Sequence, residues 1–236
     1  MLSHYSALKV AEQFRILDSF FPGRIDLGIG RAPGSDQLTA AALAYPRRQA
    51  EIQHFPQQVL DLIGFINGKI DESHPFSRIH VLPGPIPDSS PEVWLLGSST
   101  YSAQLAAQLG MPFSFADFFG NTGDYGPSVT EIYRNEFQAS NFLKKPKVNV
   151  TFQVICAPTE KEAILLGASR NLNRVAWFIG MEHGLFPPQE AADFPLTEEA
   201  RQHVDSYRKG YRDSTPGQVR DWIVDNAERY QTHDIG

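Results

Sequence analysis

The stretch GRIDLGIGRAPGSD, residues 23–36, decides the fold class of this 236-residue chain. A short apolar run over residues 25–29 leads into Gly30 and Arg31, and a turn at Pro33-Gly34 follows. The run predicts a strand that is buried on both faces, and the residues after it predict a place where a ligand approaches the backbone. In parallel α/β proteins, ligands bind at the carboxyl ends of the strands.

Outward from this stretch, predicted strands and helices alternate. EVWLLG (92–97) predicts a strand, SSTYSAQLAAQLG (98–110) a helix, and MPFSFADFF (111–119) a further strand. This alternation indicates an α/β fold with parallel strands. We expect about four strands, at roughly 25–30, 93–97, 112–116 and 148–156.

The helices and loops are read from periodicity and capping residues. We expect helices over 6–20, in two parts between 36 and 67 with a break near AYPRRQ and an end at Asn67-Gly68, and over 98–110 with an end at Gly110. Further helices are expected from residue 127 and from residue 159, where Thr159 and Glu162 predict a capping box. A last pair is expected at about 197–211 and 216–231, the latter with Thr215 as N-cap and Pro216 in its first turn. Loops are expected over 184–196 and over 69–92, and the length of the second suggests either a functional loop or a cover over a site.

Composition excludes several classes of protein. The chain is 42% hydrophobic and 20% charged, and it has no apolar run of the ~18 residues that would suggest a membrane span. A net charge of −6 without a basic tract argues against nucleic-acid binding. The start of the chain resembles neither a secretory signal nor a transit peptide, so we expect a cytoplasmic protein without a membrane partner.

Cysteine and histidine usage argues against thiol and metal chemistry. The single cysteine, Cys156, cannot form an internal disulfide, and its place at the end of an apolar run predicts a buried, inert thiol. Seven histidines are scattered without the spacing of a metal site, so we expect no metal.

Two places suit a phosphate, and the first is Gly28-Ile29-Gly30-Arg31. Its glycine spacing, G-x-G-x-x-x-G, departs from the dinucleotide fingerprint, and the lysine of a P-loop is missing. An alternative stays open here. The glycines would relieve crowding at the end of a buried strand, and Arg31 would be a surface ion-pair partner.

The second place is the start of the helix after Gly97, where Ser98, Ser99 and Ser102 lie. Unpaired N–H groups and the positive end of the helix dipole favour an anion there, and hydroxyl groups add donors. Simple capping is the alternative, although one serine suffices for a cap. Arg31 and the serines are therefore expected to converge on one phosphate.

The stretches LKVAEQFRILDSFFPGRIDLGIGRAPGSD and PEVWLLGSSTYSAQLAAQLGMPFSFA closely resemble the bacterial-luciferase-like flavin monooxygenases, in particular the luciferase-family oxidoreductases of group one. The resemblance implies a TIM-barrel fold and an enzyme that uses reduced FMN and O2 to oxidise an organic substrate such as an aldehyde. A flavin reductase would supply the reduced FMN. Carried over residue by residue, it implies an FMN-binding set of Gly30, Arg31, Gly97, Ser98, Ser99 and Ser102.

The resemblance also brings out departures from the family pattern. We expect a single domain over 1–236 that is truncated at both ends, a partial barrel with about four or five strands. The family's catalytic residues have no match here, and Phe118 stands where relatives often carry a histidine. An open barrel exposes sheet edges, which suggests a homodimer.

Two other functions fit the same resemblance. One is a flavin-binding homologue, or an inactive fragment, without turnover. The other is an oxidoreductase that uses the deazaflavin F420 on the same fold.

Overall fold

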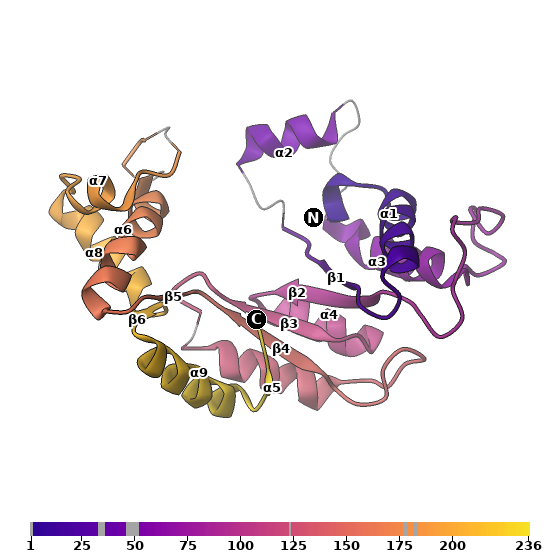
Figure 1. Ribbon diagram of the computed structural model, residues 1–236. Helices are drawn as coiled ribbons and strands as arrows, with labels where there is room; N and C mark the ends of the chain where they lie inside the picture. The colour runs from indigo at the N-terminus through magenta and orange to yellow at the C-terminus, as the bar shows by residue number, and fades with distance from the viewer. Residues whose placement is uncertain (1, 33–35, 46–51, 123, 177–178, 182–183) are drawn as a thin grey trace. The chain divides into compact units, whose positions relative to one another are not determined.

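The computed structural model describes residues 2–32, 36–45, 52–122, 124–176, 179–181 and 184–236 (Figure 1). The described strands are β1 (Asp26–Ile29), β2 (Glu92–Gly97), β3 (Phe113–Asp117), β4 (Val148–Phe152), β5 (Val154–Cys156), β6 (Arg212–Ser214) and β7 (Asp234–Ile235). The helices are α1 (Ala7–Phe20), α2 (Gln37–Ala44), α3 (Phe55–Asn67), α4 (Thr100–Leu109), α5 (Gly126–Glu136), α6 (Glu160–Ala176), α7 (Pro188–Ala192), α8 (Glu198–Arg208) and α9 (Pro216–Tyr230), with short 3-10 helices at Leu2–His4 and Ile52–His54. The expected turn at Pro33-Gly34 and the expected helix break at residues 46–49 lie outside the described residues.

The main sheet has the strand order β1-β2-β3-β4-β7, and the fold class is the expected α/β class. Strand β1 pairs with β2 in parallel, and β4 pairs with β7 in parallel. Among the described residues these strands form an open sheet and do not close a barrel.

The strand expected over 148–156 is divided in two at Gln153. Strand β4 pairs with β7, whereas β5 pairs in parallel with β6 in a separate two-stranded sheet. The short strands β6 and β7 were not expected from the sequence, because two- and three-residue strands carry too few side chains to show a period.

Contacts group the chain into two compact units. The first comprises residues 1–97, 101–114 and 136–147, and the second comprises residues 98–100, 115–135 and 148–236.

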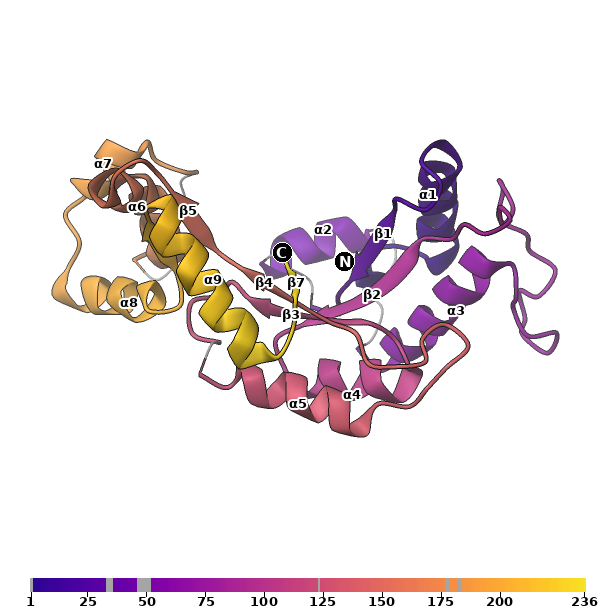
Figure 2. The same cartoon turned by 60° about the horizontal axis from the view of Figure 1, so that its bottom comes forward.

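In the first unit, helices α1 and α3 pack against each other (Figures 1 and 2). Both helices bury apolar side chains, and Ala11, Val59, Leu62 and Ile66 are fully buried. Helix α1 begins where the Ser6 side chain accepts a hydrogen bond from the N–H of Lys9, as an N-cap does. Helix α3 ends at Gly68, whose φ of +62° suits a glycine C-cap.

In the second unit, α6, α7 and α8 lie together, around a small core of Leu172, Val175 and Ala191 (Figure 1). The prediction of a loop over 184–196 was wrong in part, because α7 lies within it. Two prolines begin this short helix, and Pro188 lies in its first turn, where a proline is tolerated. The caps predicted for α6 and α9 are confirmed, since Thr159 accepts from the N–H of Glu162 and Thr215 forms a capping box.

The prediction of a buried Cys156 was wrong, because the residue is exposed. It is the last residue of the three-residue strand β5, which has one partner strand, and such a position leaves a side chain open to solvent. Over the described parts of the chain, no helix is both long and apolar enough to span a membrane.

Candidate functional site

The candidate site begins at the carboxyl end of β1. The prediction that this strand is buried on both faces was wrong, because Leu27 and Ile29 are buried whereas Asp26 and Gly28 are exposed. A Cβ added to Gly28 would come within 2.8 Å of a methyl group of Leu96 in β2. This methyl group is the end of a flexible side chain, so the alternative that the glycines relieve crowding stays a prediction. Gly30 and Arg31 follow at the strand end and are half-buried.

Arg31 does not act as a surface ion-pair partner in the described part of the chain. Its guanidinium lies over the ring of Tyr101, 4.2 Å from the ring centroid, and it makes no hydrogen bond or ion pair with the described residues. Tyr101 lies in the first turn of α4, which contains no acidic residue. The structure therefore brings a cation to the start of a helix, where the helix dipole is also positive.

Gly97 and Ser102 form a close contact at the junction of β2 and α4. A Cβ on Gly97 would collide with both the Cβ and the Oγ of Ser102, so only glycine fits at this position. Ser102 is 6% exposed, and its hydroxyl therefore packs beneath the junction. Ser98 and Ser99 form the bend between the strand and the helix, and Ser99 is exposed.

A second polar cluster was not found by the sequence reasoning. Asp117, the last residue of β3, is buried, and it accepts hydrogen bonds from Thr122 Oγ1 (2.5 Å) and from the Tyr230 hydroxyl (2.6 Å). Burial raises the pKa of Asp117, and both hydrogen bonds oppose that rise. The aspartate directly after FSFA was the available signal, because it breaks an apolar run at a strand end.

Phe118 and Phe119 follow Asp117, with ring centroids 4.6 Å apart. The carbonyl of Phe119 accepts a hydrogen bond of 2.8 Å from Arg174 of α6. This segment therefore places two neighbouring aromatic side chains directly after the carboxyl end of β3.

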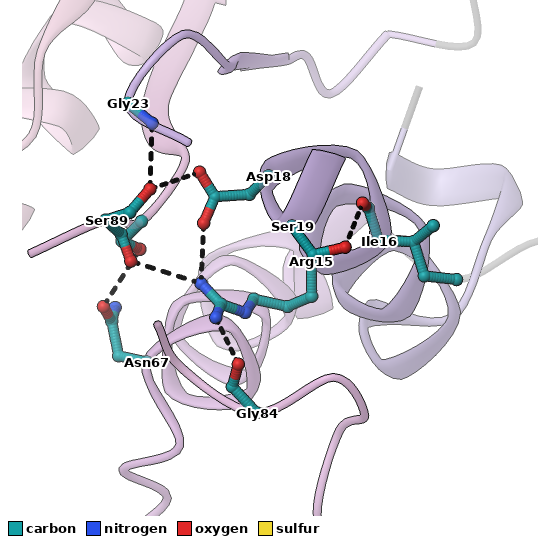
Figure 3. A network of polar contacts seen from close by, with 9 residues as sticks. Arg15, Ile16, Asp18, Ser19, Gly23, Asn67, Gly84 and Ser89 are labelled. Carbon is teal, nitrogen blue, oxygen red and sulfur yellow. Dashed lines mark hydrogen bonds and ion pairs between the residues drawn. The ribbon is translucent and has the colours of Figure 1, made fainter. Parts of the chain in front are cut away.

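The loop over 69–92 lies at the opposite end of the strands from Arg31, so the expectation that it covers the site was wrong. Ser89 accepts a hydrogen bond from the N–H of Gly23, three residues before β1, and the N–H of Glu92 at the start of β2 donates to the Ile25 carbonyl. A buried arginine of α1, Arg15, ties down the same loop, donating to the carbonyls of Gly84 and Ser89 (Figure 3).

An ion pair within α1 completes this network. Arg15 Nη1 lies 3.1 Å from Asp18 Oδ2, and both side chains are fully buried. The other carboxylate oxygen of Asp18 accepts from the Ser89 hydroxyl at 2.7 Å (Figure 3). The loop thus packs at the amino ends of the strands. In barrel enzymes, residues at this face contribute to stability.

The residue types at the candidate site are suited to binding an anion. An arginine presents a planar fork of N–H donors that matches a phosphate, and the first N–H groups of a helix lack partners within the helix. No group of three or more His, Cys, Asp or Glu side chains that could hold a metal ion occurs among the described residues.

The sheet defines an α/β protein whose candidate site lies after the carboxyl ends of two neighbouring parallel strands, β1 and β2. The model of the luciferase-like monooxygenases matches residues 1–230, so the chain belongs to this family.

A luciferase-like monooxygenase of Escherichia coli K12 is 42% identical over 188 residues, which is 80% of this chain and 53% of that protein. The chain thus spans about half the length of this relative.

Solved structures agree on the fold. The structure of apo-MsnO8 is 30% identical with a TM-score of 0.83, and the match covers 100% of this chain and 69% of that one. The oxygenating constituent of 3,6-diketocamphane monooxygenase from Pseudomonas putida, in complex with FMN, is 17% identical with a TM-score of 0.56, covering 99% and 69%. The last similarity concerns the fold alone.

Proposed function

We propose that this chain carries the phosphate-binding part of an FMN-dependent monooxygenase, which oxidises an organic substrate with O2 and with reduced FMN from a flavin reductase. The observation that carries the proposal is the guanidinium of Arg31, stacked on Tyr101 at 4.2 Å with its N–H donors unpaired in the described part of the chain. Membership of a monooxygenase family supports the reaction class.

The donor set fits a terminal phosphate. Arg31 offers a fork of N–H donors, and the start of α4 offers N–H groups at the positive end of the helix dipole. Gly97 lets the backbone come close to Ser102, and Gly30 leaves the strand end without a side chain. Ser98 and Ser99 are also predicted to bind the phosphate, and this prediction rests on the sequence.

Bound reduced FMN would supply the reaction with O2, through which one oxygen atom enters the substrate and the other leaves as water. The residues of this chain would hold the phosphate and so orient the cofactor. The oxygenating constituent of 3,6-diketocamphane monooxygenase shares the fold and is solved in complex with FMN, so the fold can accommodate this flavin.

The proposal is tested by comparing FMN with riboflavin, which lacks the phosphate. Flavin fluorescence titrations would give both Kd values for the wild type, Arg31→Ala and Arg31→Lys. We expect Arg31→Ala to weaken FMN binding by about 1.5–3 kcal/mol, the range for hydrogen bonds to charged groups, and to leave riboflavin binding unchanged. Arg31→Lys should recover only part of the loss, because an ammonium group lacks the fork. An FMN affinity that is the same in all three proteins would overturn the assignment.

Oxygen consumption with reduced FMN and a series of aldehydes then tests the reaction. Product that depends on both O2 and substrate supports a monooxygenase. FMN binding without such product supports the flavin-binding homologue instead, and preferential binding of F420 supports the deazaflavin enzyme.

A further inference from the structure

Arg31 and Arg170 each lie over a tyrosine ring, but they differ in the hydrogen-bond partners of their guanidinium N–H groups. In the second unit, the guanidinium of Arg170 lies 4.1 Å from the ring centroid of Tyr211, and its two terminal nitrogens donate to the two carboxylate oxygens of Asp213 at 2.8 and 2.6 Å. In the first unit, Arg31 lies over Tyr101 at nearly the same separation, 4.2 Å. No described acidic residue pairs with Arg31. Arg31 therefore has an aromatic partner, as Arg170 has, but it has no carboxylate partner among the described residues.

The acidic residue that follows Arg31 most closely in sequence is engaged elsewhere. Asp36 is the N-cap of α2, and its carboxylate accepts from the N–H of Thr39 at 2.9 Å and from the Thr39 hydroxyl at 2.6 Å. Arg31 is thus left beside the positive end of α4 without a counter-charge from the described residues, an arrangement that an oxyanion would stabilise.

The contact uses the ring of Tyr101 and not its hydroxyl. The hydroxyl makes no hydrogen bond to any described residue, and the side chain is 39% exposed. A guanidinium stacked on a ring keeps its N–H donors in its own plane, pointing away from the ring. A ring 4.2 Å from the guanidinium carbon limits the space open to the Arg31 side chain, and no described residue takes up its N–H donors.

We infer that Tyr101 is a positioning residue, which holds the Arg31 guanidinium ready for a terminal phosphate and thereby raises the preference for FMN over riboflavin. The inference rests on the proposed function for the identity of the ligand. The stacking itself is a property of the chain without ligand, and it can be measured separately.

The binding test compares Tyr101→Phe with Tyr101→Leu, using FMN and riboflavin as probes at low salt. We expect Tyr101→Phe to keep the FMN Kd within about twofold, because the ring remains. Tyr101→Leu should weaken FMN about five- to tenfold, and it should change riboflavin by less than about twofold. In an Arg31→Ala background the same leucine substitution should have no further effect, because the two residues act as one unit. The matched control is Tyr45→Leu, since Tyr45 is 82% exposed and makes no aromatic contact with the described residues.

Arg31 itself provides the second readout. Relaxation of its Nε–H group, measured by NMR without flavin, should show an ordered side chain in the wild type and in Tyr101→Phe, and a mobile one in Tyr101→Leu. Equal mobility in all three proteins would overturn the inference even if FMN binds. Equal losses of FMN and riboflavin affinity in Tyr101→Leu would also overturn it, because Tyr101 would then contact the flavin ring or support the fold. If Arg31 is ordered by Tyr101 but the wild type does not distinguish FMN from riboflavin, the phosphate assignment fails and the positioning role stands.

Discussion

The hydroxyl of Tyr230 donates a hydrogen bond of 2.6 Å to Oδ2 of Asp117. The two residues are 113 positions apart in sequence, one at the end of β3 and the other at the end of α9. Asp117 also accepts from Thr122, so one buried carboxylate connects a strand end, the following loop and the last long helix.

Replacing Tyr230 with phenylalanine tests the value of this connection. Tyr230→Phe keeps the ring and removes one donor to a buried carboxylate, so we expect the free energy of unfolding to fall by about 1.5–3 kcal/mol. Urea unfolding measures the change. Tyr125→Phe is the control, because the Tyr125 hydroxyl makes no hydrogen bond to the described residues, and its effect should stay within about 0.5 kcal/mol. Equal losses in the two variants would contradict the role of the hydrogen bond.

The raised pKa of Asp117 predicts a pH dependence. Burial favours the protonated carboxyl in the folded state, so Asp117 contributes most to stability below its ordinary pKa of 3.8. That contribution is lost as the pH rises through the raised folded pKa. Asp117→Asn removes the titration at nearly constant shape. We therefore expect the wild type to lose stability relative to Asp117→Asn as the pH rises from about 4, and the difference to level off above the folded pKa. Urea unfolding at a series of pH values measures it, and a difference that grew in favour of the wild type would contradict the sign.

Arg15 should be a strong determinant of stability. Arg15→Met leaves the buried carboxylate of Asp18 without its cation and the Gly84 carbonyl without its donor, and we expect a loss of about 3–5 kcal/mol. The exposed Arg24 supplies the control, since Arg24→Met should change the free energy of unfolding by less than about 0.5 kcal/mol. A double variant, Arg15→Met with Asp18→Leu, should lose less than Arg15→Met alone, because no buried charge then remains unpaired. A double variant that is as unstable as the single one would argue against the ion pair as the cause.

The contact of Gly97 with Ser102 predicts a clash and its relief. Gly97→Ala should destabilise the protein by about 1–3 kcal/mol through overpacking. Ser102→Gly removes both colliding atoms, so the double variant should be more stable than the sum of the two single changes predicts. Thermal unfolding of the four proteins measures the coupling. Gly217→Ala is the comparison, since nothing lies within 4 Å of a Cβ at that position, and perfect additivity in the main series would refute the contact.

Local signals in the sequence predicted much of the fold. The alternation of strands and helices, the helix ends at Gly68 and Gly110, and the caps at Thr159 and Thr215 depend on residues close together in the chain. These features were found because a cap or a period involves neighbours three or four positions apart.

The parts that were missed depend on distant partners. Arg31 could be named from the sequence, but its stacking on Tyr101 joins positions 70 residues apart, and no pattern in either segment specifies the other. The same holds for Asp117 with Tyr230. The position of the loop over 69–92 was also missed. Its composition predicts a loop but does not indicate at which end of the strands the loop packs.

Because Arg15 anchors that loop, the residues that stabilise the first unit are separate from those of the candidate anion site. Stability is built around the amino ends of β1 and β2, and the candidate anion site lies after their carboxyl ends, so the two properties depend on separate sets of side chains. A directed-evolution experiment can therefore randomise the surroundings of Arg31 while the network around Arg15 is left untouched, and libraries that search for a new cofactor should retain a large share of folded members.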